Sequence, residues 1–127
     1  MNENSKITGF SHGGAVYSSV RIDDDGIFTM NGGEISGNSN TGAVSVHSSG
    51  STFKMNGGTI TNNNCTNGGS GGVNLYKGTF IKNGGTISGN TSSDTDVSQA
   101  SMKAGAKYGT DSSIETLTED RKISTAF

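Results

Sequence analysis

The feature of this sequence that most limits its fold is an internal repeat. Three segments align without gaps: GIFTMNGGEISGN, which ends at Asn38, STFKMNGGTITNN, which ends at Asn63, and GTFIKNGGTISGN, which ends at Asn90. The second and third segments end 25 and 27 residues after the one before. Short runs in which apolar and polar residues alternate predict β-strands, and the Gly- and Asn-rich stretches between them predict turns. Each repeat is therefore expected to hold three short strands.

The length of the repeat selects the architecture. A unit of about 25 residues with three strands and no helical periodicity is typical of one coil of a parallel β-helix, whereas a propeller blade needs about 40 residues and four strands. We predict an all-β fold, a right-handed parallel β-helix (β-solenoid), as one domain over residues 1–127. Three regular coils of about 25–29 residues would occupy residues 7–90, and a degenerate fourth coil or cap would occupy 91–127.

Stacking of the coils at a strand spacing of about 4.8 Å places equivalent residues above one another. The repeat predicts three apolar ladders inside the coils: Phe28, Phe53 and Phe80; Ile7, Ile35, Ile60 and Ile87; and Val16, Val44 and Val73. It predicts two corner ladders in which each asparagine amide bonds the next: Asn31, Asn56 and Asn83; and Asn38, Asn63 and Asn90. The Gly-Gly pair that follows each member of the first asparagine set fits a turn with positive φ.

The repeat is less regular at both ends. After Asn90 we expect Val97, Ala106, Tyr108 and Ile114 to take the places of Val73, Phe80, Lys82 and Ile87. Residues 21–25 of the first copy are expected to form a loop. Residues 113–127 are charged, and the alternatives for them are a cap formed by a short strand or helix, or a frayed end.

Composition excludes several classes of function. The formal net charge is −2, and no run of Lys or Arg offers the basic surface that nucleic acid requires. No stretch approaches the roughly 18 apolar residues of a membrane span, and the first ten residues show no signal peptide. Cys65 is the single cysteine, which excludes an internal disulfide. Because only 28% of residues are hydrophobic, the core is thin, and a short stack needs more coils, a cap or a partner.

Two short motifs carry a resemblance to a known family. FxxN occurs at residues 28–31, 53–56 and 80–83, and GGA followed by an aliphatic residue occurs at residues 13–16. Over residues 7–90 these motifs resemble the repeats of the polymorphic outer-membrane proteins and related bacterial β-helix surface proteins. The resemblance implies an extracellular or cell-surface passenger that displays an adhesive or structural surface to a host or matrix ligand.

The carboxylates do not form the cluster that a β-helix lyase or hydrolase would need. Asp23, Asp24 and Asp25 lie together in one loop, with no acid at the equivalent positions of the next coils, and His12 and His47 occupy non-equivalent positions. We therefore expect no enzyme activity, no catalytic residue and no cofactor. The three aspartates are also the candidate for a Ca²⁺ loop, although a solvated acidic turn is the preferred interpretation.

Outward positions beside the isoleucine ladder form a candidate binding face. They carry hydroxyl groups, as an ice- or glycan-binding face would, at Thr8, Ser36, Thr59, Thr61, Thr86 and Ser88. Thr and Ser also suit exposed strand positions for purely structural reasons. We favour a non-enzymatic structural or adhesive module. The alternatives are a filament subunit that stacks on itself through open solenoid ends and a glycan- or ice-binding protein.

Overall fold

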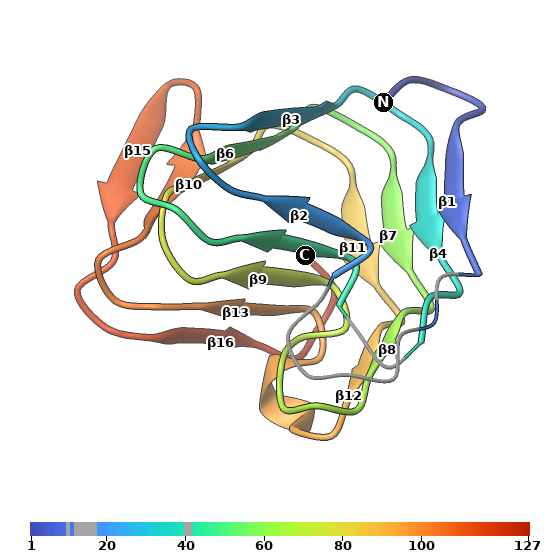
Figure 1. Cartoon of the computed structure of the whole chain (residues 1–127). Helices are drawn as coiled ribbons and strands as arrows, with labels where there is room; N and C mark the ends of the chain where they lie inside the picture. The colour runs from blue at the N-terminus through green and yellow to red at the C-terminus, as the bar shows by residue number, and fades with distance from the viewer. Residues whose placement is uncertain (10, 12–17, 40–41) are drawn as a thin grey trace.

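The computed structural model describes residues 1–9, 11, 18–39 and 42–127, and it confirms an all-β parallel β-helix. Strands from successive coils stack into three sheets that enclose the interior (Figure 1). The Ile sheet contains β1 (Lys6–Thr8), β4 (Glu34–Ser36), β7 (Thr59–Thr61) and β11 (Thr86–Ser88). The Phe sheet contains β3 (Ile27–Met30), β6 (Thr52–Met55), β10 (Thr79–Lys82), β14 (Lys107–Thr110) and β15 (Ser113–Thr116). The Val sheet contains β2 (Val20–Ile22), β5 (Val44–Val46), β9 (Val73–Leu75), β13 (Ala100–Met102) and β16 (Arg121–Ile123).

Smaller elements fill the corner between the Ile and Val sheets. There β8 (Asn64–Cys65) pairs in parallel with β12 (Thr91–Ser92), and a single 3-10 turn, η1, spans Thr95–Val97. The Cys65 thiol is buried at this corner.

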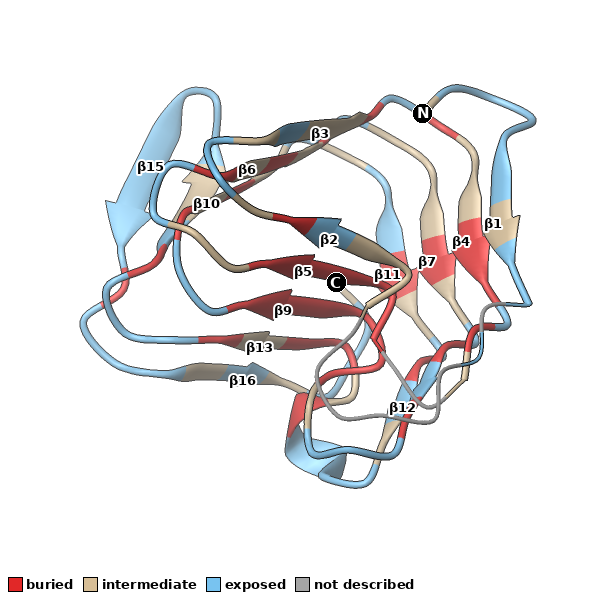
Figure 2. Ribbon diagram, in the orientation of Figure 1, coloured by how far each residue is buried: buried red, intermediate tan, exposed pale blue. Residues whose placement is uncertain are grey.

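The predicted aromatic and isoleucine ladders are present in the predicted register. Phe53 stacks between Phe28 and Phe80, with ring centroids 5.5 Å and 4.8 Å apart. Ile7, Ile35, Ile60 and Ile87 pair directly across the Ile sheet. The middle members of both ladders are fully buried, and Figure 2 shows the buried residues on the strands that face the interior. The apolar core is therefore a set of columns that run along the coil axis.

The valine ladder is confirmed only in part. Val44 pairs with Val73, as expected. Val16 lies outside the described residues, and the residue of the first coil that pairs with Val44 is Val20. The loop predicted for residues 21–25 is also corrected, because Arg21 and Ile22 belong to β2. The count back from the Gly-Ala-Val segment failed because the second coil is short between its Ile and Val strands: 9 residues separate Ile35 from Val44, whereas 13 separate Ile7 from Val20.

Both asparagine ladders form the predicted amide-to-amide hydrogen bonds. In the buried ladder, Asn38 Nδ2 donates to Asn63 Oδ1 at 2.8 Å and Asn63 Nδ2 donates to Asn90 Oδ1 at 2.9 Å. Gln99 extends this ladder, because its Oε1 accepts a bond of 2.8 Å from Asn90. In the exposed ladder, Asn56 Nδ2 donates to Asn31 Oδ1 at 2.7 Å, and Asn83 Nδ2 donates to Asn56 Oδ1 at 2.9 Å. The ladders thus satisfy polar groups that the tight corners would otherwise leave without partners.

The Asn-Gly-Gly corners require glycine at their second Gly. Gly33, Gly58 and Gly85 have φ of 85°, 88° and 80°. A Cβ on Gly85 would lie 2.6 Å from Met55 Cε and 2.8 Å from the Gly58 carbonyl oxygen. Both the backbone conformation and the close approach of the preceding coil therefore exclude a side chain.

A fourth coil is present, but its predicted register relative to the third coil is wrong. Ala100, not Val97, pairs with Val73, and Val97 lies in η1. Tyr108 pairs with Phe80, two residues away from its expected place. The shift arises because this coil has the length of the one before it: 13 residues separate Ile87 from Ala100, as they separate Ile60 from Val73, so a position 24 residues after Val73 falls short of β13.

The C-terminal segment forms a cap made of strands. In the Phe sheet, β15 runs antiparallel to β14, which places Ile114 beside Gly109 and not over Ile87. In the Val sheet, β16 runs antiparallel to β13. In the Ile sheet, the backbone of Phe127 exchanges hydrogen bonds of 2.8 Å and 3.0 Å with Ile87. All three sheets therefore end in a covering segment at this end of the stack.

The opposite end of the stack is more open. Strands β1, β2 and β3 are edge strands of their sheets, each paired on one side only within the described residues. Met1 covers part of this edge, since its amino group donates to the Thr29 carbonyl oxygen at 2.6 Å and its carbonyl accepts from Asn31 N at 2.7 Å. Ile7, Val20 and Phe28 are only partly buried, and Ile27 is 75% exposed. The two ends of the stack are thus chemically unlike.

Candidate binding faces

The six predicted hydroxyl residues do come together on the outer face of the Ile sheet. Register places Thr59 beside Thr86, and it places Thr8, Ser36, Thr61 and Ser88 in one row across the four strands. Thr8 and Thr86 are exposed, Thr59, Thr61 and Ser88 are half-buried, and Ser36 is only 5% exposed. The accessible hydroxyl face therefore lies mainly over β7 and β11.

An ion pair occupies the N-terminal part of the same face. Lys6 Nζ lies 3.3 Å from Glu34 Oε1. A hydrogen bond from Ser36, and then one from Lys6, hold the pKa of the Glu34 carboxyl below its ordinary value. The Ser36 hydroxyl is thus engaged with a charged group, which leaves the threonines of β7 and β11 as the uniform part of the face.

The acidic loop is a tight turn in which one carboxylate is already paired. Asp24 and Asp25 have φ of 50° and 64°, in the left-handed region that Asp tolerates better than most residues. Asp23 forms an ion pair with Arg21, and this guanidinium is the main cause of the lowered pKa of Asp23. The Asp24 amide donates to Ser48 Oγ at 3.1 Å. Among the described residues, no group of three His, Cys, Asp or Glu side chains is placed to hold a metal ion.

A row of chemically active side chains that the repeat did not reveal follows the strands of the Val sheet. The residues after β2, β5, β9 and β13 are Asp23, His47, Tyr76 and Lys103. The rings of His47 and Tyr76 lie 4.6 Å apart with an angle of 30°. Burial, and then the charge of Arg21, lower the pKa of His47. The sequence could have indicated this row, because each of the four residues directly follows an apolar strand at an equivalent place in its coil.

No family model, no curated protein and no solved structure matches this chain. None of the helical segments that the structure describes has the length and apolar character needed to cross a membrane.

Proposed function

We propose that this chain is a non-enzymatic structural or adhesive module of an extracellular or cell-surface protein. The observation that supports it is the outer face of the Ile sheet, where threonine and serine hydroxyls repeat at the strand spacing of about 4.8 Å. A rigid, evenly spaced array of donors and acceptors suits an extended ligand with its own repeat, such as a glycan. The titratable groups support the same proposal, because the acids with lowered pKa are surface carboxylates held by local Lys or Arg partners and hydrogen bonds.

The test is a binding screen of the whole chain against neutral and acidic glycans and matrix proteins. Thr59→Val, Thr61→Val and Thr86→Val together remove three hydroxyls while they keep side-chain shape and β-propensity. Thr52→Val with Thr79→Val is the control, since these threonines are also register partners but lie in the Phe sheet. We expect the first variant to lose binding and the control to keep it. If the triple variant and the control bound the ligand equally well, the Ile sheet would not be the binding face.

Self-association is a second candidate function, and the open N-terminal end is the observation that favours it. Unpaired strand edges template the addition of further strands, and the apolar columns end there at partly exposed Ile7, Val20 and Phe28. The cap at the other end argues against a simple filament, because the parallel ladders do not continue through β15, β16 and Phe127. A closed pair joined through two N-terminal ends is therefore the preferred form of assembly.

Light scattering coupled to size exclusion, followed by electron microscopy, separates these forms. We expect a concentration-dependent dimer that Val20→Lys abolishes. Fibres in the micrographs would favour the end-to-end filament over the dimer. A chain that stays monomeric at millimolar concentration would exclude both the dimer and the filament.

A further inference from the structure

A second candidate binding site lies on the opposite side of the molecule from the Ile sheet, at the corner between the Val and Phe sheets. A solvent-open pocket of about 450 Å³ is lined there by Ser49, Lys77, Gly78, Ala104, Gly105 and Lys107. These residues come from the turns that follow β5, β9 and β13, together with the first residue of β14. A pocket of this size lies within the range of small-ligand sites.

Stacked turns hold the walls of this pocket in place. Gly78 has φ of 78°, and a Cβ there would lie 2.4 Å from the Ser51 carbonyl oxygen, so this turn packs closely on the coil below. Gly105 has φ of 87°, but a Cβ added there would meet no atom within 4 Å, which leaves the space beside it empty. The Lys107 amide donates to the Gly78 carbonyl at 2.9 Å and thereby fixes the distance between the two turns. The pocket is thus formed by the fold itself.

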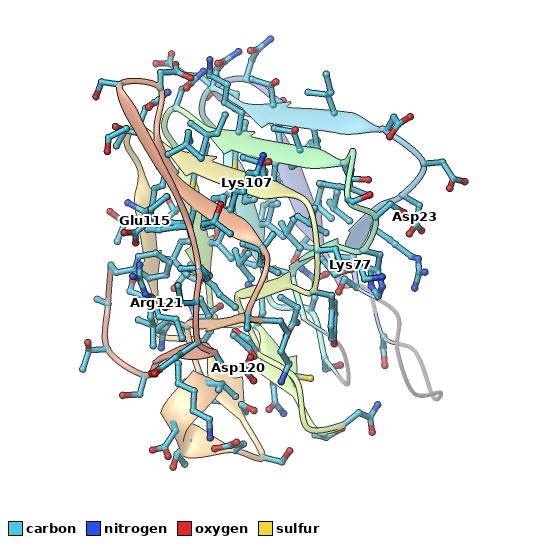
Figure 3. The ribbon with its side chains drawn as sticks, turned by 90° about the vertical axis from the view of Figure 1, so that its left-hand side faces the viewer. Asp23, Lys77, Lys107, Glu115, Asp120 and Arg121 are labelled. Atoms are coloured by element: carbon cyan, nitrogen blue, oxygen red, sulfur yellow. The ribbon has the colours of Figure 1, made fainter. Side chains whose placement is uncertain are left out.

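The lining of the pocket is positively charged, and the carboxylate at its edge, that of Asp120, accepts a hydrogen bond of 2.9 Å from the Ala104 amide. The lining includes two lysines and no acid, and both lysines are exposed. Within the described residues neither Lys77 nor Lys107 forms an ion pair, whereas Lys103 nearby is paired with Asp120 at 3.0 Å. Figure 3 looks onto this side of the molecule, and Lys77, Lys107 and Asp120 lie on it. Two free ammonium groups beside an open pocket attract an anion.

The surroundings of the pocket fit a carbohydrate better than a nucleic acid. Tyr76 directly precedes Lys77 in the chain, is 37% exposed and has its ring 4.6 Å from that of His47, so an exposed aromatic side chain follows the same strand as one of the two cations. Aromatic rings offer apolar area next to polar groups, as the C–H face of a pyranose requires. The formal net charge is −2, and the three aspartates of residues 23–25 lie along the same corner, which disfavours an extended polyphosphate.

We propose that the pocket between Lys77 and Lys107 binds the carboxylate or sulfate group of an acidic glycan. This inference rests on the proposed adhesive function, because it gives the module a ligand class, but it uses a different side of the molecule from the threonine face. The ammonium groups bind the anion, and Tyr76 packs against the sugar ring that carries it.

The test is isothermal titration of the whole chain at low ionic strength with three probes: a sulfated uronate-containing tetrasaccharide, a neutral tetrasaccharide and inorganic sulfate. We expect the acidic tetrasaccharide to bind more tightly than either of the others. Lys77→Gln with Lys107→Gln should weaken its binding by about tenfold, as expected for the loss of two exposed ion pairs. Ala104→Leu, which fills the pocket without a change of charge, should also weaken it.

The control is Lys54→Gln with Lys122→Gln, which lowers the net charge by the same amount at residues that line neither the pocket nor the threonine face, and it should bind like the parent chain. Equal loss in this control would show unspecific attraction and overturn the inference, as would sulfate binding as tightly as the tetrasaccharide. Binding that depends on the threonine face but not on the lysines would also overturn it, yet would leave the proposed adhesive function standing.

Discussion

Replacement of Phe53 by alanine tests the columnar core at its centre. The Phe53 ring is fully buried and stacks on two neighbouring rings, at an angle of 1° to that of Phe80. Removal of a buried Phe side chain costs about 3–5 kcal/mol of unfolding free energy, and each lost ring pair adds roughly 0.5–1.5 kcal/mol beyond burial. Because two ring pairs are lost, we expect Phe53→Ala to lose about 4–8 kcal/mol, against a total of roughly 6–19 kcal/mol for a chain of this length.

Two control variants separate ring stacking from position in the stack. Phe28 lies at the open end, is only partly buried and stacks on one ring, so Phe28→Ala should cost about half as much. Phe53→Leu keeps most of the buried volume but loses both ring pairs, so it should cost about 1–3 kcal/mol. The measurement is urea unfolding followed by circular dichroism and by tyrosine fluorescence, whose transitions coincide if unfolding is two-state.

Two results would refute this reasoning. A loss below about 1 kcal/mol for Phe53→Ala would mean that the ring is not enclosed. Equal losses for Phe28→Ala and Phe53→Ala would mean that the N-terminal end is covered in solution.

Three further predictions concern the corners and the surface charges. Asn63→Ala should cost about 2–3 kcal/mol because it strands buried groups of Asn38, Asn90 and the Ile35 carbonyl, whereas Asn56→Ala, in the exposed ladder, should cost under about 1 kcal/mol; similar costs in urea unfolding would contradict the distinction. Gly85→Ala should destabilise more than Gly68→Ala, although both have φ near 80°, since only at Gly85 does the added Cβ meet atoms of another coil; a larger loss of melting temperature for Gly68→Ala would sink this account. The pKa values of the Glu34, Asp111 and Asp120 carboxyls are lowered in the folded chain, so their contribution to stability is complete above their ordinary pKa, near 4, and is lost as the pH falls through their folded-state values. Lys54→Met removes the ion-pair partner of Asp111 and should therefore reduce the loss of stability on acidification. An unchanged dependence of stability on pH would show that the pair is not formed.

The sequence was enough to predict the regular part of the fold because its information is repeated. Phe53 and Ile60 have counterparts at the same spacing before and after them, and stacking at constant strand spacing converts that spacing directly into contact. The Asn63 ladder was predictable for the same reason. Positions were misassigned where copies differ in length, as for Val20 in the first coil and Tyr108 in the fourth.

The candidate sites were less predictable because they depend on turns and on the ends of the stack. The threonines of the Ile sheet could be placed together from register alone. The pocket between Lys77 and Lys107 could not, because its walls come from turns of unequal length whose residues have no shared motif. The antiparallel cap could not be predicted from the sequence either, since residues 113–127 contain no copy of the repeat with which to align them.

The most direct test of the central claim, a stack of parallel coils in the stated register, is nuclear Overhauser spectroscopy on a chain labelled at Ile methyl and Phe ring positions. The stack predicts contacts in the order Ile7–Ile35–Ile60–Ile87 and Phe28–Phe53–Phe80, between residues that are one coil apart. Contacts confined to residues within one repeat, or strand pairs that show antiparallel cross-peaks between β3, β6 and β10, would contradict it.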